Sequence, residues 1–270
     1  MPRLVGKLLI VGALLLELGV VGSYASADPA LQTLVTGHPS SHANTVHARV
    51  QPKKTGTTHS KKDPDRYFPS GTSSTVMKTK ATKIPKQQVK LMIDQQVHEN
   101  WTLIQSLMGF TTIDKAYAFF LGMASRLSTL NAGLETGKGT SHCYGALQAS
   151  ETAYASSRYA PENDVPQMYL YKFSPENFYD PGIAIHMGIR HVLHFVNQAK
   201  HYHGVDRIKH AMIGVDTGSI QITAKSPIKS YCNEIAALAG WYLHNGHLRD
   251  SEFTWTNDTR VSRRNPWSWY

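Results

Sequence analysis

Apolar residues recur at three- and four-residue spacing in several stretches after residue 85, and this pattern predicts amphipathic helices. The first stretch is a long helix over Val89–Met108, ended by Gly109, since glycine commonly terminates helices. The second covers Ile113–Leu130 and begins after Thr111 or Thr112, either of which can cap it through its hydroxyl. The two stretches predict a helical domain that begins near Lys86.

Further helices are marked by residues that favour helix starts. Pro175 and the Asp180-Pro181 pair each place proline at a first helical position, and Pro227 precedes the last apolar stretch. A shorter helix is expected over Arg207–Gly214. Gly188 lies inside the helix that follows Pro181, where glycine costs about 1 kcal/mol relative to alanine. Close approach of another helix would explain it.

A polar, glycine-containing loop separates the helix ending near Leu130 from the stretch that begins at Ser141. Ser141 is a plausible N-cap, and Gly145 and Gln148 would then fall on one side of the first turns. The pattern therefore predicts a helix from Ser141 towards Tyr159.

The start of the chain is typical of a secretory signal. Arg3 and Lys7 precede an apolar run over Leu8–Val21, and small residues follow at Ala25-Ser26-Ala27. We expect residues 1–27 to be removed and the mature protein to be secreted. No second long apolar run follows, so we expect no membrane association after signal removal.

Composition divides the rest of the chain. Residues 28–85 are rich in Ser, Thr, His and Lys with no sustained period, which predicts a disordered basic linker or propeptide. Residues 86–258 form the predicted folded domain, and residues 259–270 a basic, aromatic and mobile tail. We expect a monomer.

The chain is basic, with 28 Lys and Arg against 19 Asp and Glu and a formal net charge of +9. Such a protein is attracted to anionic surfaces, although a basic solvated linker is the commoner source of the excess. The sequence has no recognisable nucleic-acid module and no phosphate-binding loop, so no nucleic-acid partner and no cofactor are expected.

The chain has two cysteines, Cys143 and Cys232. In an oxidising compartment they would form one disulfide, and the alternative is two separately buried thiols. Neither belongs to a pair with metal-ligand spacing. His191 and His194 share a helical face, but with 14 histidines in the chain coincidence explains this better than a metal site.

The order of Ser128, Gly145 and Gln148 resembles the lysozyme-like superfamily, in particular soluble lytic transglycosylases and goose-type lysozymes, in which a helix ends in Glu-Ser and Gly-x-x-Gln follows. Asp180 and Gly218 also fit the family's pattern. The resemblance implies a mainly α-helical domain with a substrate cleft. The residue before Ser128, where the family has its catalytic Glu, is Leu127.

The resemblance implies cleavage of β-1,4 bonds in a cell-wall polysaccharide, peptidoglycan or a related glycan, by a carboxylic acid that protonates the leaving oxygen. Leu127 cannot donate a proton, so the catalytic residue stays open. Glu135, in the following loop, is the best substitute. The resemblance also implies these substrate-binding residues: Ser128, Tyr144, Gly145, Gln148, Asp216 and Tyr231.

Three functions therefore remain open from the sequence. One is a secreted glycosidase or lytic transglycosylase in which another carboxyl replaces the missing acid. The second is a degenerate member of the same fold that binds glycan, or another partner, without cleaving it. The third is a basic secreted effector whose tail and linker bind an acidic surface.

Overall fold

A computed structural model describes residues 65–137, 142–150, 171, 174–248 and 265–270. This part of the chain is mainly α-helical, as expected. The helices are α1 (Ser74–Ala81), α2 (Lys86–Glu99), α3 (Trp101–Met108), α4 (Ile113–Ser128), α6 (Pro175–Phe178), α7 (Pro181–Gln198), α8 (Gly204–Thr217), the π-helical turn η2 (Ile228–Cys232) and α9 (Asn233–Asn245). The strands are β1 (Glu135–Thr136), β2 (Cys143–Tyr144) and β3 (Ala149–Ser150).

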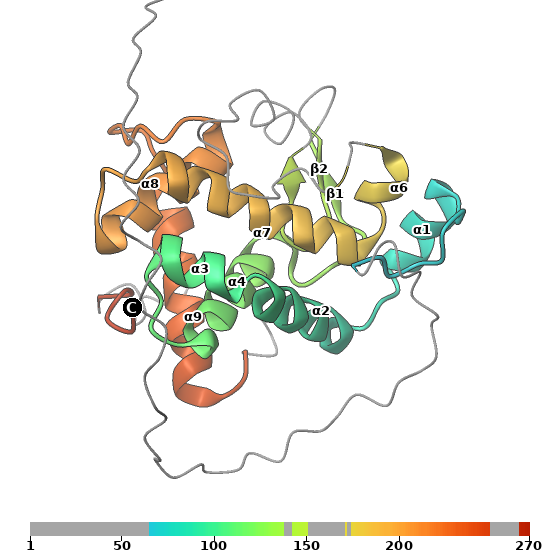
Figure 1. The fold of residues 1–270 in the computed structure, drawn as a ribbon, viewed down its shortest axis with the longest axis horizontal. Coiled ribbons are helices and arrows are strands. Elements are labelled where there is room, and N and C mark those ends of the chain that lie inside the picture. Colours follow the sequence, from blue (N-terminus) through green and yellow to red (C-terminus); the bar gives the residue numbers. More distant parts are fainter. Residues whose placement is uncertain (1–64, 138–141, 151–170, 172–173, 249–264) are drawn as a thin grey trace, which may run out of the picture. The chain divides into compact units, whose positions relative to one another are not determined.

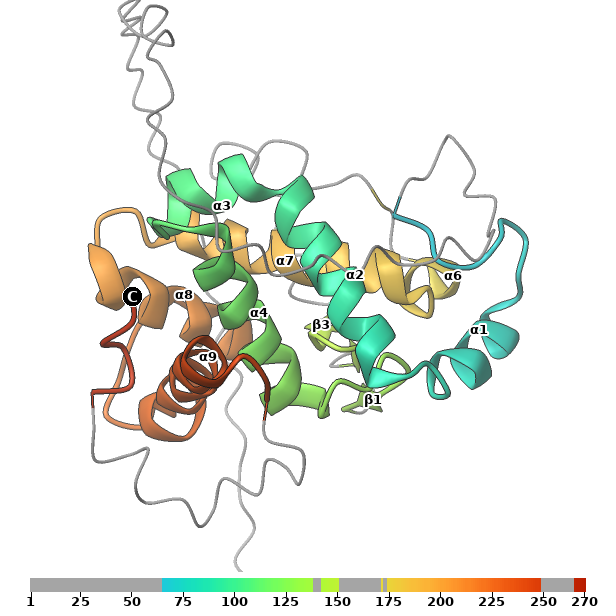
Figure 2. The same cartoon turned by 90° about the horizontal axis from the view of Figure 1, so that it is seen from below.

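Helix α4 lies at the centre of the packing, between α9 and α2, while α7 packs against α8 and α2 (Figures 1 and 2). The small sheet follows α4 directly, with its strands antiparallel in the order β1-β2-β3. Strand β3 also contacts α7. The end of α4 is therefore held between helical neighbours and the sheet. In the described part of the chain, no helix is long and apolar enough to span a bilayer.

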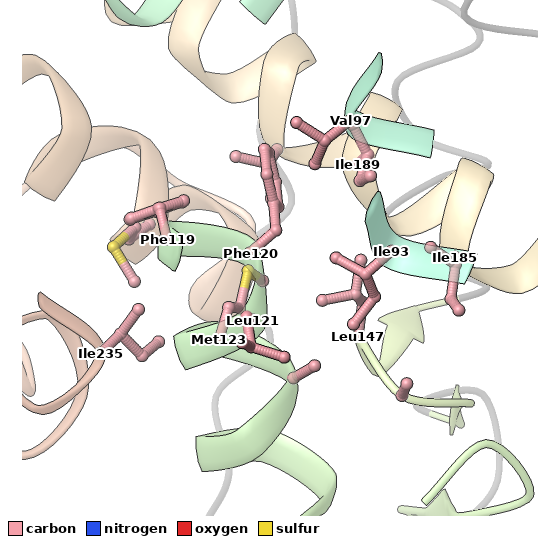
Figure 3. Packing of buried hydrophobic residues seen from close by; sticks show 14 of the residues in the cluster. Ile93, Val97, Phe119, Phe120, Leu121, Met123, Leu147, Ile185, Ile189 and Ile235 are labelled. Carbon is pink, nitrogen blue, oxygen red and sulfur yellow. The ribbon is translucent and has the colours of Figure 1, made fainter. Parts of the chain in front are cut away.

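The apolar core joins these elements. Phe119, Phe120 and Met123 of α4 point between α2, α7 and α9 (Figure 3). Ile93 and Leu147 meet on the side facing α7, and all five side chains are almost completely buried. Since a buried side chain of this size contributes roughly 1.5–3 kcal/mol, this core fixes the position of α4.

Several predicted helix starts are confirmed. The Thr112 hydroxyl accepts from Lys115 N at 3.3 Å, and Gly109 ends α3 in a left-handed conformation. Pro175 and Pro181 occupy the first turns of α6 and α7. At α7, the Asp180 carboxylate accepts from the backbone amides of the next turn, as an N-cap does.

The prediction of one long helix over Val89–Met108 is wrong in one respect, because the helix is broken at Asn100 into α2 and α3. Asn100 departs from helical backbone angles, with φ −100° and ψ 8°, and its side-chain amide donates to the Gln96 carbonyl at 2.7 Å, beside the backbone bond from Asn100 N to the same oxygen. Helix α4 ends at Ser128, two residues before the predicted end, since Thr129 and Leu130 have positive φ values of 53° and 62°.

The folded part also begins earlier than predicted. Residues 65–85, predicted as part of the linker, include α1, and Met77 in that helix is completely buried. The Asp180 carboxylate fixes this segment by accepting from the backbone amides of Tyr67 and Phe68 at 2.8–3.0 Å. The same side chain therefore caps α7 and holds the arm that precedes α2. Residues 1–64, including the predicted signal, lie outside the described residues.

The helix predicted from Ser141 is wrong in its described part, because residues 143–150 form strands β2 and β3. Gly145 and Gln148 have φ values of 72° and 50°, and Gln148 N donates to Gly145 O at 3.2 Å in the turn between the strands. The turn also explains Gly188. A Cβ there would lie 2.7 Å from Leu147 Cβ, so the close neighbour is this turn and not another helix.

The described end of the chain packs against the domain, so the prediction of a mobile tail is wrong for residues 265–270. Trp267 Nε1 donates to Asn233 Oδ1 at 2.9 Å, and Trp269 Nε1 to Ala236 O at 2.7 Å. Tyr270 donates its hydroxyl hydrogen to Met108 O at 2.5 Å. Three aromatic side chains thus join α9 to the end of α3, and their apolar area outweighs the basic composition that suggested a free tail.

Candidate functional site

The end of α4 and the β2–β3 turn are joined by Ser128. Its buried hydroxyl contacts the carbonyl oxygens of Ala124 and Ala146, each at 2.8 Å. A buried hydroxyl left without a partner would cost about 1–3 kcal/mol. Ser128, predicted to line a cleft, therefore has a structural part in holding the turn against the helix.

Gln148 and Gly145 lie in that turn. The Gln148 side-chain amide donates to Gly145 O at 2.8 Å and to Leu134 O at 3.3 Å, and its Oε1 accepts from the Thr136 hydroxyl. Gly145 approaches α7, since a Cβ there would lie 3.1 Å from Ala184 Cβ. The structure thus brings Ser128, Gly145 and Gln148 together, as predicted, but around a hairpin turn.

The last turn of α4 presents Arg126 and Leu127 beside α9. Arg126 Nε lies 2.5 Å from Glu234 Oε2, and both side chains are partly exposed. Leu127 is partly buried and packs against the apolar core. An aliphatic side chain therefore occupies the position between a surface ion pair and the buried Ser128.

Asp216 lies within electrostatic range of this ion pair. Desolvation raises the pKa of its carboxyl, although the residue is exposed by area, and the Arg126 guanidinium opposes the rise. Burial raises the pKa of the Tyr231 hydroxyl, and the Asp216 carboxylate raises it further. Helix α8, which carries Asp216, contacts η2, which carries Tyr231, and α9 packs on both η2 and α4. Arg126, Asp216 and Tyr231 therefore lie on neighbouring elements beside the end of α4, and we treat them as one group, in which Asp216 and Tyr231 are predicted substrate-binding residues.

The two cysteines also lie near Asp216. Burial raises the pKa of the Cys143 thiol, and raises that of Cys232 to about 12, and the Asp216 carboxylate contributes to both rises. Both are free thiols in the structure. The disulfide alternative is therefore wrong for this structure, and the alternative of two separate thiols describes it.

Glu135 lies in β1, opposite Tyr144 of β2. Its carboxylate accepts from Lys78 Nζ and, at 3.4 Å, from the Tyr179 hydroxyl. The hydrogen bond from Lys78 holds the pKa of Glu135 below its ordinary value. Since a general acid must be protonated before it reacts, this environment favours a carboxylate role for Glu135 over its predicted role as the acid.

Sequence reasoning missed one pair of neighbouring carboxyls, Asp65 and Glu99. Asp65 and Glu99 both bond to the Gln96 amide, at 2.5 and 2.7 Å. Burial raises the pKa of Glu99, and the neighbouring Asp65 carboxylate adds to the rise. Burial alone would raise the pKa of Asp65, but His186 and the Tyr171 hydroxyl hold it below its ordinary value. No sequence signal could have found this pair, because Asp65 lies in a stretch with linker composition.

The described residues contain no group of three or more His, Cys, Asp and Glu side chains that could hold a metal ion. His191, one of the two histidines that share a face of α7, is buried, and burial lowers its pKa to about 3. It is therefore neutral at physiological pH, as expected of a core residue.

The charge of Arg126 provides a test of the group formed by Arg126, Asp216 and Tyr231. Arg126 lowers the pKa of Asp216, so Arg126→Gln should raise that pKa further and keep the carboxyl protonated to higher pH. The carboxyl carbon shift of Asp216, followed by NMR during a pH titration, measures the change. Arg66→Gln is a matched control, since Arg66 donates to Asn177 and should leave the Asp216 titration unchanged. An Asp216 pKa that falls in Arg126→Gln would contradict the grouping.

Comparison with known proteins identifies relatives of this fold. The family model of the Cel124 C-terminal catalytic domain matches residues 84–243. The solved structure titled "CtCel124: a cellulase from Clostridium thermocellum" shares 48% sequence identity, with a TM-score of 0.69, over 76% of this chain and 99% of that one. A GH124 cellulase from Ruminiclostridium thermocellum in complex with Mn and fructosylated cellopentaose matches with the same values. None of the curated proteins matches the chain.

These matches overturn the assignment to the lysozyme-like superfamily and, with it, the expected action on peptidoglycan. The motifs behind that assignment were short, and the structure places Gly-x-x-Gln in a hairpin turn, whereas the prediction was a helix. The expected polysaccharide partner is supported in its general form, because one relative is solved with an oligosaccharide of cellulose type.

Proposed function

The chain belongs to the family of the Cel124 C-terminal catalytic domain, and we propose that it hydrolyses β-1,4-glucosidic bonds in cellulose or a related β-glucan. The observation that carries this proposal is the 48% identity to a cellulase over 99% of that protein's chain. An identity of this size over a whole catalytic domain supports the same substrate class, whereas fold alone would not.

We place the reaction beside the end of α4, where Arg126, Asp216 and Tyr231 come together. Hydrolysis of a glycosidic bond needs a carboxylic acid that is still protonated when it meets the leaving oxygen. Asp216 is exposed to a ligand, and desolvation raises the pKa of its carboxyl. These two properties make Asp216 our candidate for the general acid.

Neighbouring groups are suited to supporting roles. The buried Tyr231 hydroxyl remains protonated, since burial raises its pKa, and so it can donate a hydrogen bond. Arg126 is held by Glu234 and can offset charge on Asp216 once the proton has left. Leu127 offers the substrate an apolar surface and no proton.

Export is part of the proposal, because an insoluble polymer such as cellulose cannot enter a cell. The support for export is the pattern of the first residues, a basic start followed by an apolar run and small residues. N-terminal sequencing of the protein from the culture medium of its host would test it, and a mature chain that begins near Asp28 is the expected result.

The linkage preference tests the function itself. The protein should release soluble sugars from amorphous cellulose and from mixed-linkage β-glucan, and none from a purely β-1,3-linked glucan or from chitin. Chromatography of the soluble fraction measures this. The proposal would be abandoned if chitin or the β-1,3-glucan were degraded and cellulose were not.

A further inference from the structure

A second polar group lies on the sheet, and the reaction as proposed does not use it. It consists of Lys78 from α1, Glu135 from β1, His142 before β2 and Tyr179 after α6. His142 Nδ1 lies 3.8 Å from Glu135 Oε1, and Lys78 Nζ lies 5.5 Å from the centre of the Tyr179 ring. Elements distant in the sequence thus converge on one carboxylate, which we call the Glu135 group.

The Glu135 group is accessible to a ligand. The side chain of Lys78 is 48% exposed, that of His142 32% and that of Glu135 21%. Beneath it the rings are packed together, since Tyr144 stacks on Phe178 at 4.4 Å and meets Tyr179 edge-on at 5.6 Å. Polar groups with fixed positions above an aromatic base are the features that bind sugars, which have apolar faces and hydroxyl edges.

Stabilising the contact between α1 and the sheet is not a sufficient role for the Glu135 group. An exposed Lys–Glu pair contributes about 0–1 kcal/mol to stability because solvent screens it. Helix α1 is already anchored by the completely buried Met77 and by Ala81. The Lys78–Glu135 pair therefore contributes little to holding α1 against the sheet. Because the pair is partly exposed, its polar atoms can exchange partners with a ligand.

Strand β2 links this group to the proposed reaction site. Neighbouring residues of a strand point to opposite faces. The Asp216 carboxylate contributes to the raised pKa of Cys143, and the next residue, Tyr144, packs on Tyr179 in the Glu135 group. A polymer that is cleaved beside Asp216 extends over several sugar units, so a unit that takes no part in the reaction can occupy the Glu135 group.

We propose that Lys78, Glu135, His142 and Tyr179 form a subsite for a glucosyl unit of the β-glucan other than the two units joined by the cleaved bond. The Glu135 carboxylate accepts hydrogen bonds from sugar hydroxyls, Lys78 and His142 donate to them, and Tyr179 supplies ring surface. This assignment rests on the proposed function, and it gives Glu135 a binding role in place of an acid role.

Oligosaccharide length separates this subsite from the reaction site. Isothermal titration of the full chain with cellotriose and cellohexaose should show that Glu135→Gln weakens cellohexaose binding by about 10-fold or more, the loss expected for a hydrogen bond to a charged group. Cellotriose binding should change little. Lys78→Met should act in the same direction with a smaller loss, and Thr79→Ala, an exposed change on the same helix, should have no effect.

Three results would overturn the subsite. Equal losses for both oligosaccharides, or no loss for either, would mean that Glu135 does not bind a sugar other than the two joined by the cleaved bond. Loss of turnover in Glu135→Gln with saturating cellohexaose would make Glu135 the acid. A natural chain that binds neither oligosaccharide would overturn the proposed function together with the subsite, whereas the first two results leave that function intact.

Discussion

Asp216→Asn lowers the turnover of a soluble β-1,4-glucan by about 10²–10⁴-fold, the range expected when a general acid is removed. Asparagine keeps the size of the side chain and cannot release a proton, so folding should be unaffected. Initial rates of reducing-sugar release give the ratio, with circular dichroism to confirm the fold. In the natural chain, activity should fall as the pH rises through the raised pKa of Asp216, because the acid then loses its proton.

Two further variants test whether Asp216 is the acid. Glu99→Gln is a matched control, since Glu99 is an exposed carboxyl whose pKa is also raised but which lies beside Asp65. It should retain nearly full activity. Leu127→Glu places a carboxyl one residue from Arg126. If Leu127→Glu restores the activity of Asp216→Asn to the natural level or above it, residue 127 is the acid position and our assignment of Asp216 is wrong.

Trp267→Ala lowers the free energy of unfolding by about 3–5 kcal/mol, the usual cost of truncating a buried tryptophan. Trp267 is only 5% exposed, and its indole nitrogen donates to Asn233 at the start of α9. Removing the ring leaves a cavity against α9, the helix that packs most closely on α4. Denaturant unfolding followed by circular dichroism measures the change.

Ser268→Ala is the control for this prediction. Ser268 is the neighbouring residue and its side chain is exposed, so the variant should stay within about 0.5 kcal/mol of the natural chain. Equal stability of Trp267→Ala and Ser268→Ala would show that the C-terminal residues are not anchored in solution as they are in the structure.

Local chemistry was enough to predict many helix boundaries. Thr112, Gly109 and the capping function of Asp180 act through hydrogen bonds or backbone conformations that involve only their own neighbours, so these roles can be read without the fold. The second role of Asp180, its bonds to the amides of Tyr67 and Phe68, depends on the fold. The predominance of helices was predictable for the same reason, because apolar spacing reports the buried face of each helix.

The hairpin and the two chain ends depend on distant contacts, and there the prediction failed. Gln148 adopts a positive φ because its side chain bonds to Leu134 and Thr136 on the preceding strand and loop. The C-terminal aromatic residues are ordered by α9 and α3. Composition at these places suggested a helix and a mobile tail, since it carries no information about which surface a segment will meet.

For the site, the sequence identified residues that do lie together, but it attached them to the wrong family. Ser128, Gly145 and Gln148 are neighbours in space, and the Asp216 carboxylate contributes to the raised pKa of Tyr231. The raised pKa of Asp216 and the ion pair on Glu135 depend on tertiary neighbours that spacing cannot reveal. Without them, the sequence pointed to Glu135 for the acid, whereas we propose Asp216.

The most direct test of the central claim is the digestion of cellohexaose by the natural chain in ¹⁸O-labelled water, followed by mass spectrometry of the products. Hydrolysis of β-1,4-glucosidic bonds predicts shorter cello-oligosaccharides that carry one ¹⁸O at each newly formed reducing end. Intact cellohexaose after prolonged incubation with correctly folded protein would contradict the account, and products without the label would mean that the bond is cleaved by a reaction other than hydrolysis.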